Sequence, residues 1–402
     1  MHLFTRRKGA PAPRKPSPQL VKRRVTIQLA LVDRPLMTET EFLVAPRYRS
    51  LRLLGAGSYG IVVSALDASP SRAPPPRRVA IKKILAAFAN AHMARHVLRE
   101  LRLLRHLHHP HVVQLLDIDR PPAFAAWQDV YLVTPLLTTD LRDALLQGRL
   151  EHPPTQKKVA YQMLLALEHL HSQGIMHRDI KSRNLLLDDH YNLKLCDLGE
   201  SRFYSKANRD DDIAPPVREP ELTGGVSTVI QSAPELSLGA PYDAEVDIWA
   251  AGCVIAEIVR PGHAYLFDST GKQSHVQEII DMVGYPSDDI LAILPDYGQW
   301  YLKRQRRRKG AKNRIADAMR EGVDPLVVDL LENMIRFSPK DRISARAALD
   351  HPWFDDVRKP QPTVAKPYDF ARSEPPSKTS KAQLKKLIWE EVVAFHPEAA
   401  DG

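Results

Sequence analysis

The fold is decided by the stretch His177-Arg178-Asp179-Ile180-Lys181-Ser182-Arg183-Asn184, and Asp197-Leu198-Gly199 begins thirteen residues after its last member. The two segments fit the pattern H-R-D-x-K-x-x-N followed by Asp-x-Gly. Phosphoryl transfer needs a carboxylate to orient the attacking hydroxyl, a cation on the transferring phosphate and oxygen ligands for magnesium. These groups are supplied, in that order, by Asp179, Lys181, Asn184 and Asp197. The spacing therefore predicts a phosphotransferase site.

A glycine cluster lies upstream, in the segment Gly55-Ala56-Gly57-Ser58-Tyr59-Gly60-Ile61-Val62, which fits G-x-G-x-x-G-x-V. Alone this pattern is weak, because Rossmann turns and tight hairpins carry the same spacing. Here the glycines open a strand, and Val79-Ala80-Ile81-Lys82 follows. The combination favours a lid of backbone amides over ATP phosphates, with Lys82 binding two of them. Strand alternation sends Lys82 and Lys83 to opposite faces, so only one of them can enter the cleft.

Around these motifs the chain divides into a strand-rich part and a helix-rich part. Up to Leu137 the apolar residues mostly alternate, with one helical stretch from Met93 to Leu104, whereas long amphipathic helices dominate after Thr138. We therefore expect an α+β protein with a small antiparallel β lobe, residues 47–137, and a mainly helical lobe, residues 138–354. Residues 1–46 are expected to be a basic flexible arm, and residues 355–402 a C-terminal extension.

Composition narrows the class of protein. The chain has 402 residues, a net charge of +9 and two cysteines, which excludes a disulfide scaffold and is typical of a reduced, intracellular globular protein. No apolar run is long enough to span a membrane. Two acid-free runs, residues 1–32 and Lys303–Arg314, carry eight bases each. They could bind nucleic acid, anionic lipid or nuclear import receptors, or they could be a solvated tail and loop. We expect a cytoplasmic or nuclear location, or both.

With these motifs the chain resembles a eukaryotic protein kinase, and more narrowly a MAP kinase of the CMGC group. The narrower resemblance rests on APRYRSLRLLGAGSYG, HVLREL, DVYLVTPLLTTDL, GIMHRDIKSRNLLL, MIRFSPKDRISARAALDHPWF and AQLKKLIWEEVVAF. The last segment is similar to the C-terminal extension that MAP kinases pack back on the small lobe. The resemblance covers about Glu41 to the C-terminus. It implies the bilobal protein-kinase fold over residues 47–354, ATP and Mg²⁺ as cofactors, and phosphorylation of protein Ser or Thr residues, with a preference for a following proline left open.

The resemblance also implies roles for individual residues. Glu100 would pair with Lys82 in the active state, and Asn184 and Asp197 would bind Mg²⁺. The expected partners are protein substrates, an upstream activating kinase and a phosphatase, without a membrane or a specific nucleic acid, and the chain would be a monomer. The nucleotide would be held by Leu54, Gly55, Ala56, Gly57, Ser58, Tyr59, Gly60, Val62, Ala80, Lys82, Thr134, Pro135, Leu137 and Leu186. The apolar members of this set are equally good core residues.

The activation segment departs from the family pattern. Where MAP kinases carry Thr-x-Tyr, this chain has Thr223-Gly224-Gly225, and the two family arginines that bind the phosphotyrosine are replaced as well. By the resemblance, the arginines for the phosphothreonine match Arg99, Arg178 and Arg202. Three guanidiniums could order a loop around one phosphate, so we expect activation at Thr223 alone. The alternative is that these arginines pair with Asp or Glu, such as those at residues 210–212.

Two other classes of function stay open. Leu198 in place of the usual Phe, the unusual Glu200 and the altered activation segment are also compatible with a pseudokinase scaffold that binds partners without turnover. Retention of Lys82, Glu100 and the four catalytic-loop and magnesium residues favours catalysis. A nucleic-acid-binding protein that uses the basic runs is the third reading, but the runs lack interleaved aromatic residues.

Overall fold

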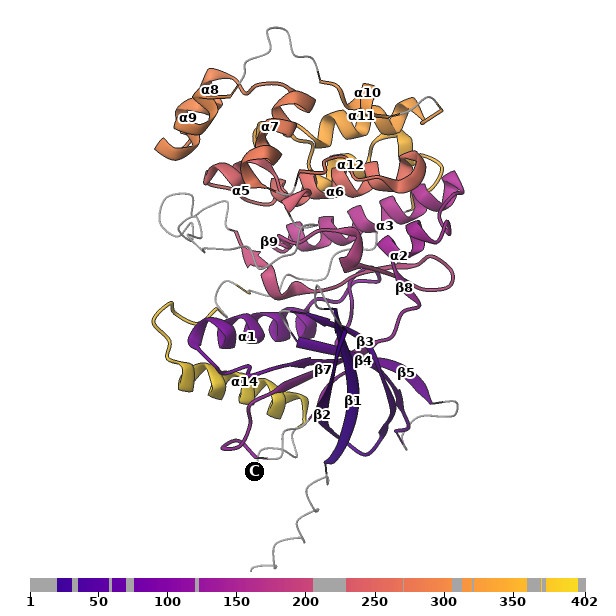
Figure 1. Cartoon of the computed structure of the whole chain (residues 1–402), viewed down its shortest axis with the longest axis vertical. Helices are drawn as coiled ribbons and strands as arrows, with labels where there is room; N and C mark the ends of the chain where they lie inside the picture. The colour runs from indigo at the N-terminus through magenta and orange to yellow at the C-terminus, as the bar shows by residue number, and fades with distance from the viewer. Residues whose placement is uncertain are drawn as a thin grey trace, which may run out of the picture.

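The computed structural model describes residues 20–30, 35–57, 60–69, 76–119, 123–204, 229–269, 271–305, 313–319, 322–359, 370 and 374–396. They form two lobes, one built mostly of strands and the other mostly of helices, as the sequence predicts (Figure 1). Within these residues no helix is both long enough and apolar enough to cross a membrane.

The small lobe is built on a five-stranded antiparallel sheet with the order β3-β4-β5-β7-β6. In β5, Val79 and Ile81 are buried, whereas Ala80 and Lys82 are partly exposed. This alternation arises because successive side chains of a strand point to opposite faces. One face is therefore packed into a core and the other is turned toward the second lobe. The strands are β3 (Tyr48–Gly57), β4 (Gly60–Asp67), β5 (Arg77–Ile84), β6 (Asp117–Ile118) and β7 (Val130–Pro135).

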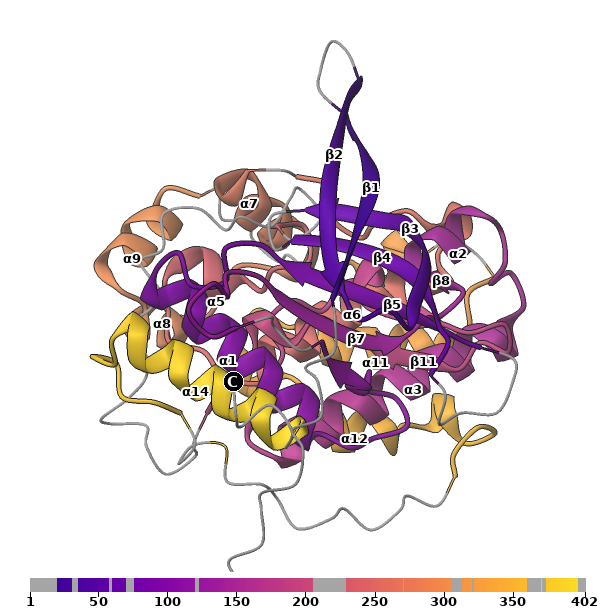
Figure 2. The same cartoon turned by 90° about the horizontal axis from the view of Figure 1, so that it is seen from below.

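A β-hairpin covers the outer face of this sheet, and it corrects our prediction of a flexible arm for residues 20–30 and 35–46; residues 1–19 and 31–34 lie outside the described residues. Strands β1 (Val21–Ala30) and β2 (Pro35–Val44) pair antiparallel, and the hairpin extends beyond the sheet (Figure 2). Val25, Phe42 and Val44 are buried against strands of the sheet. An acid of the second strand balances a base of the first, since Lys22 pairs with Glu41 at 3.0 Å.

One long helix, α1 (Ala91–His106), packs against the small-lobe sheet, and the last helix, α14 (Lys381–Phe395), lies beside it (Figures 1 and 2). Asn90 caps α1 by accepting a hydrogen bond from the Met93 amide at 2.8 Å. Ser380 and Gln383 form a capping box at the start of α14. Both caps satisfy backbone donors in the first turn of their helices.

The large lobe is centred on α3 (Pro153–Ser172) and α6 (Glu245–Val259), whose inward side chains are almost fully buried. Short strands and 3₁₀ turns on the side facing the small lobe carry the polar motifs: β8 (Thr139–Asp140), β9 (Ile175–Met176), η1 (Ser182–Asn184), β10 (Leu185–Leu187), β11 (Leu193–Leu195), η2 (Leu198–Glu200) and β12 (Arg202–Phe203). The remaining elements are α2 (Leu141–Leu146), α5 (Pro234–Leu238), η3 (Pro261–His263), α7 (Lys272–Val283), α8 (Asp288–Ile293), α9 (Asp296–Lys303), α10 (Ile315–Ala318), α11 (Pro325–Met334), η4 (Pro339–Asp341), α12 (Ala345–Leu349) and η5 (Pro352–Phe354).

Candidate active site

The loop between β9 and β10 brings three of the predicted catalytic residues together. The Asp179 carboxylate accepts a hydrogen bond from Lys181 Nζ at 2.7 Å and one from Asn184 Nδ2 at 2.9 Å. Asn184 Nδ2 also donates to the Asp179 carbonyl at 2.8 Å. Asp179 is buried, and these donors hold its carboxylate in a fixed position. A carboxylate held in this way can orient a hydroxyl group and accept its proton.

Asp247, in the first turn of α6, binds the backbone of this loop. It is not among the residues predicted from the sequence. Its carboxylate, 1% exposed, accepts hydrogen bonds from the backbone amides of His177 at 2.7 Å and Arg178 at 2.8 Å, and it contacts His171 Nε2 at 2.9 Å. Burial alone would raise the pKa of Asp247, but the hydrogen bond and charge of His171, together with the charge of His177 and the hydrogen bond from the Arg178 amide, hold it below the usual value. The available signal was an acid between apolar residues, Val246 and Ile248, in the first turn of an otherwise apolar helix.

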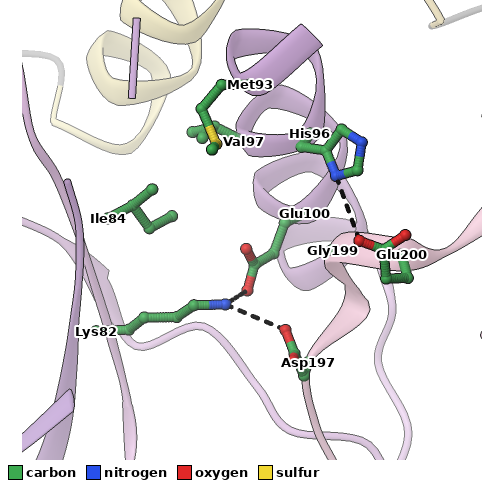
Figure 3. Close-up of a pocket in the computed structure, with 9 residues that line it drawn as sticks. All are labelled: Lys82, Ile84, Met93, His96, Val97, Glu100, Asp197, Gly199 and Glu200. Atoms are coloured by element: carbon green, nitrogen blue, oxygen red, sulfur yellow. Dashed lines mark hydrogen bonds and ion pairs between the residues drawn. The ribbon is translucent and has the colours of Figure 1, made fainter. Parts of the chain in front are cut away.

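Lys82 joins the two lobes across the cleft (Figure 3). Its Nζ donates to Glu100 on α1 at 2.7 Å and to Asp197 at 3.2 Å. Burial would lower the pKa of Lys82, but the charges of Glu100 and Asp197 raise it well above its usual range. Burial likewise opposes ionisation of Asp197, and the Lys82 ammonium holds the pKa of that carboxyl below its usual value. Lys82 and Asp197 are therefore charged at neutral pH, whereas burial raises the pKa of Glu100 against the opposing charge of Lys82.

The polar residues fit a magnesium nucleotide. Asp197 offers a carboxylate, and the two bonds from Asn184 Nδ2 to Asp179 leave the Asn184 amide oxygen without a donor among the described residues. In the described part of the chain, no group of three or more His, Cys, Asp or Glu side chains could hold a metal ion. In phosphotransferases Mg²⁺ is held by one or two protein oxygens, and phosphates and water complete its coordination.

The predicted nucleotide residues line the cleft face of the small-lobe sheet and the strand opposite. Val62 lies beside Lys82 in the strand pairing, and Ala80 lies beside Thr134. These residues, together with Pro135, Leu137 and Leu186, are only partly buried, although their strand neighbours are nearly all buried. Leu186 lies on β10 in the large lobe. Apolar side chains left half-exposed on both sides of a cleft are what a flat aromatic base requires.

The glycine segment forms the end of the β3–β4 hairpin. Gly55, Ala56 and Gly57 are exposed, as is Leu54, and a Cβ on Gly55 or Gly57 would meet no atom within 4 Å. Gly60 differs, because its φ of +130° and its contact with the Lys83 carbonyl leave no room for a side chain. The backbone at Gly55 and Gly57 is therefore open to a ligand. Ser58 and Tyr59 lie outside the described residues.

Of the predicted regulatory residues, the three arginines lie close together and Thr223 lies outside the described residues. Arg178 and Arg202 each donate to the Glu200 carbonyl at 3.3 Å, and Arg202 also donates to the Ser201 carbonyl at 2.9 Å. Burial and then the charges of Arg99 and Arg178 lower the pKa of Arg202 to about 10. Arg99 forms an ion pair with Glu374, which precedes α14.

Comparison with known proteins agrees with this geometry. Residues 48–354 match the protein kinase domain family. The chain is 34% identical to mitogen-activated protein kinase 10 of Arabidopsis thaliana, over 87% of this chain and 84% of the relative. It is equally identical to the mitogen-activated protein kinases HOG1 of Chaetomium globosum, over 89% and 92%, and hog-1 of Neurospora crassa, over 90% and 94%. The chain therefore belongs to the eukaryotic protein kinases and, within them, to the MAP kinases, which are Ser/Thr protein kinases.

Proposed function

We propose that this MAP kinase transfers the γ-phosphate of ATP to protein Ser or Thr hydroxyls, with the assembled cluster of Lys82, Glu100, Asp179, Lys181, Asn184 and Asp197 as its catalytic machinery. The observation that carries the proposal is the position of Lys82, which contacts Glu100 at 2.7 Å and Asp197 at 3.2 Å at the same time. A scaffold without turnover has no chemical need for this arrangement.

In this mechanism Asp179 orients the substrate hydroxyl and takes its proton as the oxygen bonds to the γ-phosphorus. The bond to the β–γ bridging oxygen breaks and ADP leaves. Lys181 lies 2.7 Å from the Asp179 carboxylate and places its positive charge near the transferring group. Lys82 binds the other phosphates of the nucleotide, and Glu100 keeps it extended. Asn184 and Asp197 would hold Mg²⁺, which neutralises charge on the phosphates.

We further propose that phosphorylation of Thr223 alone switches the enzyme on, through Arg99, Arg178 and Arg202. The support is the spatial grouping of these arginines and the loss of the family tyrosine, which is Gly225 here. An upstream kinase and a phosphatase would be the regulatory partners. We propose that the enzyme is a monomer and that it acts in the cytoplasm, the nucleus or both. Whether it prefers a proline after the acceptor residue is left to measurement.

The test is transfer from labelled ATP with magnesium to a basic protein substrate, followed by mapping of phosphosites. Asp197→Ala should abolish transfer, whereas Asp189→Ala, an exposed carboxylate nearby, should retain it. The Thr223→Ala variant, treated with an upstream kinase, should stay at the basal rate. Transfer by Thr223→Ala equal to that of the loop-phosphorylated wild type would refute the single-site switch. Nucleotide binding without any transfer would favour the scaffold.

A further inference from the structure

Two histidines face each other on the first two turns of α1. His92 and His96 are four residues apart, so their side chains lie on the same side of the helix, one turn from each other. Their Nε2 atoms are 3.2 Å apart, and their ring centroids are 4.3 Å apart. Neither ring takes part in the transfer mechanism described above. The pair is therefore a cluster of titratable side chains whose role is still to be assigned.

The distance between the two nitrogens is that of two ligands of one metal ion. Zinc binds imidazole nitrogen at about 2.0–2.1 Å, and tetrahedral coordination then places neighbouring ligand atoms about 3.3–3.4 Å apart. Histidines at positions i and i+4 of a helix can bind one ion together, because both rings project from the same side. The Nε2 atoms of His92 and His96 would therefore have to move very little to share an ion.

Glu200 faces the other ring nitrogen of His96. Its Oε1 lies 3.7 Å from His96 Nδ1 (Figure 3). A carboxylate on this side favours the tautomer that carries its proton on Nδ1, which leaves the lone pair of Nε2 on the side of His92. Histidines that bind metals are commonly oriented by a carboxylate in this way. This arrangement gives Glu200, which departs from the family pattern, a defined part in the site.

The protonation and the exposure of the pair also suit a metal ion. Burial, followed by the charge of Arg202, lowers the pKa of His96 to about 4, so this ring is neutral at pH 7 and its lone pair is available. His92 is exposed, so an ion can reach the pair from solvent. Neutral imidazole is a good ligand for zinc, copper and nickel, whereas Mg²⁺ prefers oxygen. The pair is therefore selective for other metals than the nucleotide site.

Arg202 opposes a cation at this place. Its Nη2 lies 3.4 Å from His96 Nε2, so it approaches the same lone pair as His92. A bound ion would replace this long contact, and the charge of the guanidinium would repel the ion. Removal of the guanidinium should therefore tighten metal binding. A simple hydrogen bond between the two histidines carries no such expectation.

We propose that His92 and His96 bind a divalent transition-metal ion, with Zn²⁺ as the ion of choice, while Glu200 orients His96 and water completes the coordination. Two protein ligands are consistent with the lack, in the described part of the chain, of a metal-binding group of three or more His, Cys, Asp or Glu side chains. A bound ion polarises the imidazole and strengthens the attraction between its Nδ1–H and Glu200. Because Glu200 belongs to η2, the ion fastens α1 to the segment that follows Asp197.

The test is a titration of the metal-stripped full chain, without a histidine tag and without nucleotide, with Zn²⁺ in competition with a chromogenic chelator. His92→Gln should weaken the tightest Zn²⁺ site at least about tenfold, because one of the two protein ligands is lost. His92 is exposed, so this variant should fold like the wild type. His109→Gln is the matched control: it changes the separate His109–His169 stack and should leave the Zn²⁺ affinity unchanged.

Two further variants test the surroundings of the pair. Glu200→Gln should weaken Zn²⁺ binding about tenfold, because the carboxylate that orients His96 is lost. Arg202→Gln should tighten it about threefold or more, because a competing donor and its charge are removed. Equal Zn²⁺ affinity in His92→Gln and the wild type would overturn the proposal, and so would the absence of binding in the wild type. None of these measurements uses phosphotransferase activity, so the proposed function is tested separately.

Discussion

The adjacent residues Lys82 and Lys83 make different contacts, because successive side chains of a strand point to opposite faces of the sheet. Lys82 points into the cleft and meets Glu100 and Asp197, whereas Lys83 points to the outer face. There Lys83 donates to the Glu41 carbonyl at 2.6 Å, pairs with Asp129 at 3.2 Å and lies over the Phe42 ring. The second lysine is therefore a structural cation that fastens the N-terminal hairpin to the sheet.

This contrast gives a matched pair of variants. Lys82→Met should lower kcat/KM for phosphoryl transfer by at least about 100-fold, because a preorganised charge on the phosphates is lost. Lys83→Met should keep most of the activity but destabilise the protein by about 1–3 kcal/mol, because buried acceptors lose a charged donor. Steady-state kinetics measures kcat/KM of both variants, and urea unfolding measures their stability. A loss of transfer in Lys83→Met as large as that in Lys82→Met would contradict this division.

Histidines give the protein a predictable sensitivity to acid. His109 stacks on His169 with centroids 4.7 Å apart and lies near His111. Burial, followed by the charges of these neighbours, lowers the pKa of His109 to about 3. An unfolded histidine titrates near 6.5, so between pH 6.5 and 3 the unfolded chain binds the extra proton. The stability that this group contributes is therefore complete above pH 6.5 and is lost as the pH falls.

We accordingly expect the free energy of unfolding to fall below pH 6.5, with up to about 1 kcal/mol per pH unit from His109. His109→Asn should flatten this slope, and the exposed neighbour His108→Asn should not. Urea unfolding at pH 7.5, 6.5 and 5.5 measures the slopes. Identical slopes for His109→Asn and the wild type would remove His109 as the cause.

At the scale of elements, α14 completes the small lobe. Leu384, Ile388 and Val392 are fully buried and recur at intervals of four, so that one stripe of the helix faces inward. Trp389 adds edge contacts to Phe124 and Trp127. The helix therefore supports α1, and through it Glu100, from the side opposite the cleft.

Ile388→Ala should cost about 2–4 kcal/mol of stability, through lost burial and the cavity that remains. It should also reduce activity, because α1 would hold Glu100 less firmly against Lys82. Glu390→Ala, an exposed neighbour on the same helix, is the control and should change stability by less than about 0.5 kcal/mol. Thermal unfolding and the transfer assay check both. If Ile388→Ala lost no more stability than Glu390→Ala, the burial of Ile388 would not contribute to the stability of the protein.

The elements also show what can be predicted from the sequence alone. The catalytic loop and Lys82 were predictable because the chemistry demands particular residue types at close spacing, and the C-terminal helix was recognisable through its resemblance to the family extension. The β1–β2 hairpin was not predicted, because the proline-rich segment before it is typical of a flexible arm and the hairpin is held by contacts of Val25, Phe42 and Val44 with the sheet. Asp247 and Glu374 could not be predicted, since each acts on residues roughly 70 and 280 positions away. Only the folded chain brings such partners together.

At the scale of the whole molecule, the site is divided between the lobes. Lys82 and Glu100 come from the small lobe, and Asp179, Asn184 and Asp197 come from the large lobe (Figure 1). The Lys82–Asp197 contact is the direct polar link across the cleft within this cluster. A nucleotide bound between the lobes would add further links and favour a closed arrangement.

A non-hydrolysable ATP analogue with Mg²⁺ should therefore raise the unfolding temperature. At 100 times its dissociation constant, a ligand stabilises the folded state by about 2.7 kcal/mol. In Asp197→Asn the added effect of Mg²⁺ should largely vanish, while the analogue alone still binds. Thermal unfolding with and without Mg²⁺ measures this. An undiminished Mg²⁺ effect in the variant would place the metal elsewhere.

The pairing of α1 with residues 374–396 also bears on how the chain is made. Arg95 meets the carbonyl of Ser377, which lies 282 positions later in the sequence. A ribosome that adds about 5–20 residues per second takes roughly 15 to 60 seconds to cover that distance. During this time α14 has not been synthesised. The side of α1 that will contact α14 therefore has no partner helix, and the small lobe lacks its last element. A chain that ended before residue 374 would lack these contacts and would leave this side of α1 exposed to solvent.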